Sequence, residues 1–173
     1  APAISLLRPL YPNTPCLFLY RSPDEVLASH HKIPGTQVIP GLLEAEWYTS
    51  DSSTIKHMTH LEYGVWVIEQ ILSAALLAQK DQPMLLVNYN EIASIFTPVI
   101  APFFNISSND KFTTDLNNTL QCNSKEPSQK YHNDTRDKQA IAKKLYSESQ
   151  LAGVNRLYAA MEKERLNQRK HQI

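Results

Sequence analysis

The chain lacks features that mark several protein classes. Its 173 residues include only four glycines, which excludes collagen and glycine-rich linkers. Two cysteines, Cys16 and Cys122, cannot build a disulfide framework, so a reducing compartment or at most one bridge is expected. Lys plus Arg and Asp plus Glu number 17 each, and this balance argues against a broadly basic nucleic-acid surface. No apolar run is long enough to predict a membrane span.

The composition that remains is that of a globular domain. Apolar residues make up 42% and charged residues 20%, unlike a disordered chain. No signal peptide is visible after Ala1, which favours the cytoplasm. From Cys122 onward there are 11 basic and 6 acidic residues, and the earlier part has 6 basic and 11 acidic. We interpret the basic C-terminal part as a solvated helical surface rather than a binding patch.

The first predicted unit is a strand followed by a helix. Residues 15–20 are apolar and rich in aromatics, which predicts a buried strand. Ser22 and Glu25 have the spacing of a capping box, with Pro23 at the first helical position. The helix is expected to end near Lys32, before a Pro-Gly pair.

The rest of the chain alternates helices, one strand and loops. The periodicity and the turn residues predict, in order, mostly loop over 36–54, a long amphipathic helix over 59–79, a second buried strand over 83–89, a helix capped by Asn90 and kinked or ended by Pro98, a long loop over 105–134, and C-terminal helices over 135–170 that are continuous or broken near Gly153.

This order predicts an α/β fold. Continuous apolar strands that are joined through helices favour a parallel sheet flanked by helices. Two strands are too few for such a sheet to be stable alone. We therefore expect residues 1–173 to form one partial domain, the incomplete and helix-rich C-terminal part of an α/β unit.

The strongest candidate site lies where the first strand meets its helix. Arg21 leaves the carboxyl end of the strand, and Ser29 lies two turns into the helix on the face of Ser22. A guanidinium beside free helix N–H groups is a good phosphate site, and ligands of open α/β sheets bind at this edge. The alternative is structural: Arg21 pairs with Asp24 or Glu25, and Ser29 is only a helix residue.

These residues also resemble a known family. The pattern Arg-x-Pro-x-x-Val-x-x-Ser over residues 21–29 is similar to the 3′-phosphate motif of sulfotransferases. Two further segments match in the right order: Tyr63-Gly64-Val65-Trp66 resembles the family's Tyr-Gly-Ser-Trp, and residues 85–92 resemble its next strand and the Tyr-Glu-Asp/Glu-Leu turn. The resemblance covers about residues 8–104 and is weak beyond them.

The resemblance implies a P-loop NTPase-like sulfotransferase fold and a nucleotide co-substrate. Arg21 and Ser29 would bind the 3′-phosphate of 3′-phosphoadenosine 5′-phosphosulfate (PAPS), and Tyr89 would contact the adenine. The complete protein would transfer a sulfuryl group to a hydroxyl or amine of a small molecule or glycan, without a metal. Without the family, Tyr89 is equally a half-buried aromatic at a strand end.

The chain departs from the family where the chemistry occurs. It has no glycine-rich turn after a strand that could hold the 5′-phosphosulfate, and no counterpart of the family's general base or of its Arg-Lys-Gly loop. The resemblance therefore implies the C-terminal portion of a sulfotransferase, which alone should not transfer sulfate. The alternative is a catalytically inactive, sulfotransferase-like binding or interaction module.

The histidines give weaker indications. His30 and His31 follow Ser29 but face different directions on a helix, so a catalytic base is not expected there. His57 and His60 could share a helix face. No Cys or carboxylate supplies an obvious third ligand beside them, so no metal site is expected.

Overall fold

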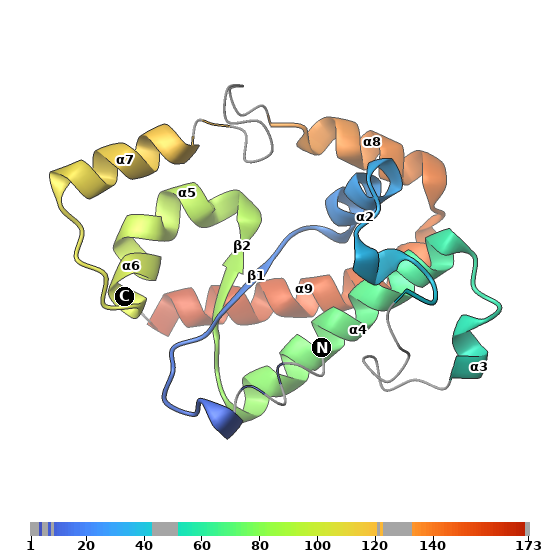
Figure 1. Ribbon diagram of the computed structural model, residues 1–173, viewed down its shortest axis with the longest axis horizontal. Helices are drawn as coiled ribbons and strands as arrows, with labels where there is room; N and C mark the ends of the chain where they lie inside the picture. Colours follow the sequence, from blue (N-terminus) through green and yellow to red (C-terminus); the bar gives the residue numbers. More distant parts are fainter. Residues whose placement is uncertain are drawn as a thin grey trace.

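The computed structural model describes residues 9–42, 52–120 and 133–171, together with Ile4, Leu7 and Cys122. Within these residues the elements follow in chain order (Figure 1): β1 (Leu17–Tyr20), α2 (Pro23–Lys32), η1 (Thr36–Val38), α3 (Ser52–Ile55), α4 (His60–Asp81), β2 (Leu85–Asn88), η3 (Tyr89–Glu91), α5 (Ile92–Ile95), η4 (Phe96–Ile100), α6 (Ala101–Phe103), α7 (Asp110–Leu120), α8 (Thr135–Leu145) and α9 (Glu148–His171). Helices dominate, and the coarse α/β expectation is confirmed.

The sheet consists of β1 and β2, which pair in parallel with Leu17 opposite Leu85 and Tyr20 opposite Asn88. All four residues of β2 are buried, whereas Leu19 in β1 is 45% exposed. The continuous apolar sequence of β2 therefore corresponds to a strand covered on both faces, as parallel sheets require.

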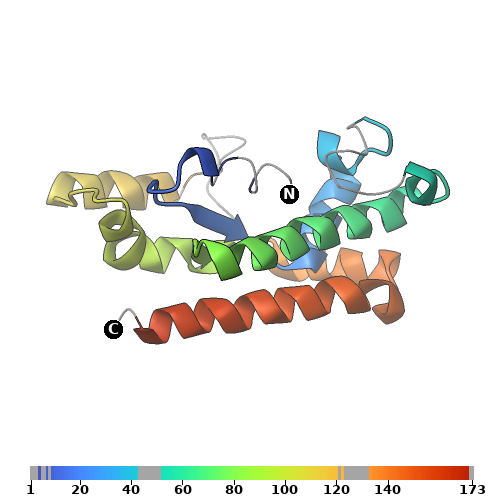
Figure 2. The same cartoon turned by 90° about the horizontal axis from the view of Figure 1, so that it is seen from below.

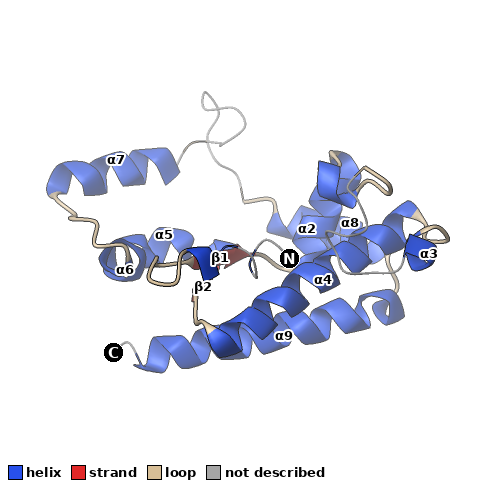
Figure 3. Ribbon diagram, turned by 60° about the horizontal axis from the view of Figure 1, so that its bottom comes forward, coloured by secondary structure: helices blue, strands red, loops and turns tan. Residues whose placement is uncertain are grey.

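Helices cover the two faces of the sheet differently. One face, which carries Tyr20 and Leu86, packs into a core with α2, α4 and α9. The other face, which carries Leu85 and Val87, packs against α5, η4 and α6. Figure 2 shows α4 and α9 side by side, and in Figure 3 the short strands lie next to α5 and α6.

Side chains of α9 also cover the outer edge of β2. The amide of Gln168 accepts from Leu86 N–H at 3.0 Å and donates to Met84 O at 2.8 Å. Arg169 Nη2 donates to Leu86 O at 2.8 Å. These bonds replace those of a neighbouring strand, so α9 satisfies backbone groups that an edge strand would otherwise leave open.

The long helix α4 begins at a capping box. The Thr59 hydroxyl accepts from Glu62 N–H, and the Glu62 carboxylate accepts from Thr59 N–H at 2.8 Å. By length and composition α4 could also cross a membrane. A core helix has the same properties, and α4 packs against α9 and α2.

Two predicted helix starts differ in detail. Ser22 is the N-cap of α2 and Pro23 its first residue, but the Ser22 side chain makes no capping hydrogen bond. The capping box was wrong because the Glu25 carboxylate is directed to Arg21 instead. After β2 the cap is Asn88 rather than Asn90, since the Asn88 carboxamide accepts from Asn90 N–H at 3.0 Å.

The predicted loop over 105–134 was wrong for residues 110–120, which form α7. Asn109 accepts from Phe112 N–H at 2.8 Å at its start, and the Phe112 ring lies 6.0 Å from that of Phe96. The 36–54 segment contains η1 and the first three residues of α3. Residues 43–51, 121 and 123–132 lie outside the described residues.

The C-terminal helices over 135–170 are confirmed, but α9 runs unbroken through Gly153. A Cβ at Gly153 would come within 2.1 Å of the Glu69 carboxylate on α4, which is the end of a flexible side chain and would have to move aside. The break instead lies between Leu145 and Glu148. There Ser147 and Gln150 exchange capping bonds at the start of α9.

Candidate functional site

The structure brings together two of the three predicted binding residues. Arg21 follows β1 and Tyr89 follows β2, at the same edge of the parallel sheet. The Cζ atom of Arg21 lies 4.8 Å from the centroid of the Tyr89 ring. This is the geometry of a cation–π contact.

Ser29 lies in α2, six residues beyond Pro23, and is half-buried. At a rise of about 1.5 Å per residue, it is roughly 9 Å along the helix from the first turn. Its backbone carbonyl accepts from Ile33 N–H at 3.0 Å. Within the part of the chain that the structure describes, Ser29 takes no part in the hydrogen bonds or ion pairs of Arg21.

Arg21 is engaged by two carboxylates. Its Nε donates to Glu25 Oε2 at 2.6 Å, and its Nη2 also contacts that oxygen. The same Nη2 lies 3.6 Å from Asp134 Oδ1. The structural alternative for Arg21 is thus realised through Glu25. Among the described residues, its Nη1 takes part in no hydrogen bond or ion pair.

Glu25 is the centre of the polar cluster, and its side chain is only 1% exposed. Besides Arg21, it accepts from the Thr135 hydroxyl of α8 at 3.0 Å and from the Asn90 carboxamide at 3.5 Å. A buried carboxylate needs such partners because they replace the hydrogen bonds that water would otherwise supply. The sequence analysis predicted a capping role for Glu25 or an ion pair with Arg21, but not its contacts with Thr135 and Asn90.

Asp134 borders the cluster on its more exposed side. Burial alone would raise its pKa, but the hydrogen bond and charge of Lys138, with the charge of Arg21, hold the pKa below its usual value. The Lys138 Nζ lies 2.9 Å from Asp134 Oδ2. Arg21 and Lys138 therefore face Glu25 and Asp134, and the formal charges of these four groups balance.

A second polar cluster holds the Tyr89 turn from the side of α9. Arg165 pairs with Glu91 on η3 and with Glu162 on its own helix. Burial alone would raise the pKa of Glu162, but hydrogen bonds from Arg165, Tyr20 and Asn88 hold it below its usual value. The pKa of Tyr20 is raised, first by burial and then by Glu162. The sequence analysis did not identify this cluster, because its residues come from segments that are far apart along the chain.

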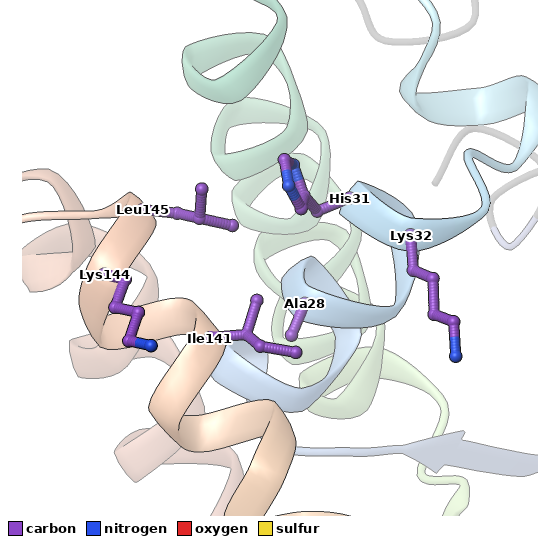
Figure 4. Close-up of a pocket in the computed structure, with 6 residues that line it drawn as sticks. All are labelled: Ala28, His31, Lys32, Ile141, Lys144 and Leu145. Carbon is purple, nitrogen blue, oxygen red and sulfur yellow. The ribbon is translucent and has the colours of Figure 1, made fainter.

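A cavity of about 470 Å³ lies between the second halves of α2 and α8. Figure 4 shows its lining, which consists of Ala28, His31, Lys32, Ile141, Lys144 and Leu145. Arg21 and Thr135 lie at the opposite ends of these helices, so this cavity is separate from the Arg21 cluster.

The two adjacent histidines have different surroundings. His31 lines the cavity, whereas His30 Nδ1 accepts from Gly35 N–H at 3.1 Å. His30 thus braces the loop after α2. Within the described residues no group of three or more His, Cys, Asp or Glu is arranged to hold a metal ion.

Comparison with known proteins gives no relative: no family model, no curated protein and no solved structure matches the chain.

Proposed function

We propose that this chain is part of a sulfotransferase-like protein and supplies the 3′-phosphate and adenine side of the site for PAPS. The observation that carries the proposal is the pairing of Arg21 and Tyr89 at the carboxyl ends of adjacent parallel strands. This is the sheet edge at which open α/β folds bind ligands. The sequence resemblance over residues 21–29 and 85–92 gives the two residues their roles.

The chemistry of this edge suits a phosphorylated nucleoside. The ten-residue α2 begins two residues after Arg21. Pro23 has no N–H, and Glu25 and Val26 N–H donate to Ser22 O, so in the described first turn Asp24 N–H is the backbone donor left beside the guanidinium. An arginine can offer two parallel donors to one phosphate. Tyr89 offers an aromatic surface for a base. Ser29 would add a hydroxyl farther along α2.

The carboxylates around Arg21 define how a phosphate would enter. Glu25 is buried and holds the Nε side of the guanidinium, which fixes its orientation. Asp134 is more exposed, with 44% of its side chain accessible, and its contact with Arg21 is longer. We therefore expect a phosphate to replace Asp134 beside Arg21, while Glu25 stays in place.

The transfer itself would occur away from these residues. In the complete protein an acceptor oxygen or nitrogen would attack sulfur as the bond from sulfur to the 5′-phosphate oxygen breaks. The acceptor proton would pass to a base, and 3′-phosphoadenosine 5′-phosphate would leave. Arg21 and Tyr89 would bind the distant end of the nucleotide and orient it. We expect this chain alone to bind nucleotide without transferring sulfate. The P-loop NTPase-like fold belongs to this proposal.

The test is calorimetric titration of the folded chain with 3′-phosphoadenosine 5′-phosphate and with adenosine 5′-phosphate. Arg21→Lys keeps the charge but loses the fork of donors. Arg156→Lys changes an exposed arginine of α9 and serves as the matched control. We expect preference for the 3′-phosphate, and a loss of about 10-fold or more in Arg21→Lys alone, because hydrogen bonds to charged groups contribute about 1.5–3 kcal/mol. Equal binding of both nucleotides would contradict the proposal.

One observation favours the alternative, a catalytically inactive binding or interaction module. Arg21 already has structural partners in Glu25 and Asp134, so it could be present for stability alone. In that case Arg21→Lys would lower the free energy of unfolding while the folded chain bound neither nucleotide.

A further inference from the structure

Arg165 of α9 is bound to the turn that carries Tyr89. Its Nη1 contacts Glu91 Oε2, and its Nη2 lies 2.8 Å from Glu162 Oε2. Arg169, one turn later, places Nη2 3.2 Å from Glu91 Oε1. Only 13% of the Arg165 side chain and 20% of the Glu91 side chain are exposed, so these ion pairs are shielded from water more than surface pairs.

These contacts close into a ring around the residue before Tyr89. Asn88 N–H donates to Glu91 Oε1 at 3.1 Å, and Asn88 Nδ2 donates to Glu162 Oε1 at 3.1 Å. Glu91 and Glu162 are in turn joined through Arg165. The ring is thus Asn88, Glu91, Arg165 and Glu162.

Asn88 has further partners that fix its side chain. Its Nδ2 also donates to Tyr158 OH at 2.9 Å, and its Oδ1 accepts from Asn90 N–H. The backbone on both sides of Tyr89 is therefore held by side-chain bonds. A single three-residue turn such as η3 has little stability of its own, so its orientation depends on these partners.

Docking of α9 does not need this ring. The apolar residues Leu151, Val154 and Met161 anchor α9 in the core, and Gln168 holds it to the edge of β2. Arg165 and Glu91 contribute something that these contacts do not: they tie the helix to the turn whose aromatic ring lies beneath Arg21.

From this geometry we infer that Glu91 and Arg165 are positioning residues, which hold the Tyr89 ring against the Arg21 guanidinium. What Tyr89 binds rests on the proposed function, whereas the positioning itself does not. Through these two residues α9 fixes the orientation of the turn that carries Tyr89.

The first experiment measures the environment of the Tyr89 aromatic ring directly. Tyrosine ring resonances of the full chain are recorded by NMR, with Tyr89 assigned through Tyr89→Phe and the lost contact defined by Arg21→Met. We expect Glu91→Gln and Arg165→Met to move the Tyr89 resonance toward its Arg21→Met position. Arg165→Lys, which keeps one charge, should restore part of the difference.

A matched control comes from the capping box at the start of α4, since Asn88 and Glu91 also form a capping box at the start of η3. Glu62→Gln removes the charge of the corresponding residue in the Thr59 box, which is exposed and belongs to another element. It should leave the Tyr89 resonance unchanged. An unmoved resonance in both Glu91→Gln and Arg165→Met would overturn the inference.

The second experiment is a double-mutant cycle on affinity for 3′-phosphoadenosine 5′-phosphate. Glu91→Gln should weaken binding about 3- to 10-fold, the range expected from a misplaced cation–π and stacking surface. In the Tyr89→Ala background the same change should have no effect. An equal loss in both backgrounds would overturn the inference. If the wild-type chain binds no nucleotide, the proposed function fails, and the NMR experiment still decides the positioning.

Discussion

Removing Arg21 should destabilise the protein more than removing Arg21 and the charge of Glu25 together. In Arg21→Met the Glu25 carboxylate, which is 1% exposed, loses its guanidinium partner. Among the described residues it then keeps the Thr135 hydroxyl and the more distant Asn90 carboxamide. In Arg21→Met/Glu25→Gln the same site is neutral, and the amide that replaces the carboxylate can still bond to Thr135.

The expected magnitudes follow from burial. Breaking a buried ion pair by removing one partner costs about 3–5 kcal/mol, and the two remaining donors to Glu25 place Arg21→Met near the lower end, about 3 kcal/mol. The double variant loses the cation–π contact with Tyr89 but has no unpaired buried charge, so we expect about 1 kcal/mol. The pair of changes is therefore strongly non-additive.

Urea unfolding followed by circular dichroism measures the difference. With a slope of about 1–3 kcal/mol per molar urea, the two variants should differ in midpoint by roughly 1 M. Arg156→Met, at an exposed position of α9, should stay within about 0.5 kcal/mol of the wild type. A double variant that is no more stable than Arg21→Met would refute the account of Glu25 as a buried carboxylate held by Arg21.

Three further predictions concern the scaffold. Leu86→Ala, at a fully buried position of β2, should lower the free energy of unfolding by about 2–5 kcal/mol, whereas Leu77→Ala, 64% exposed on α4, should lower it by under 1 kcal/mol in the same urea assay. Thr59→Ala should cost about 1 kcal/mol, because it removes the cap of α4; an unchanged midpoint would show that the box is not formed in solution. The lowered pKa of Glu162 means that its contribution to stability is present above its usual pKa and is lost as the pH falls through the folded value. The urea midpoint of Glu162→Gln should therefore fall less than that of the wild type between about pH 5 and pH 3, and parallel curves would contradict this.

The sequence predicted the local elements well because their signals are local. A six-residue apolar run, a proline at a first helical position and a helical apolar period each act within one element. The ends of α2 and the parallel pairing of β1 with β2 are accordingly as expected. Where the capping box at the start of α2 was predicted wrongly, a competing side-chain partner decided the outcome: the Glu25 carboxylate bonds to Arg21, four residues earlier in the chain.

The candidate site was predictable only in part. The position of Arg21 and Tyr89 after two parallel strands placed them at one edge, and the structure brings them into contact. Asp134 beside Arg21, Thr135 beside Glu25 and Arg165 beside Glu91 come from segments 70 or more residues away along the chain. No spacing in the sequence links these residues to the site, so the roles of Asp134, Thr135 and Arg165 can be recognised only in the folded structure.

The most direct test of the proposed nucleotide site is the NMR signal of the Arg21 Nε–H, assigned through Arg21→Lys, during titration with 3′-phosphoadenosine 5′-phosphate. If Arg21 binds the 3′-phosphate, this nucleotide should shift the Arg21 signal together with the Tyr89 ring signals. Adenosine 5′-phosphate should shift the Tyr89 signals alone. Binding that leaves the Arg21 signal unmoved, or a folded chain in which neither signal responds, would contradict the account.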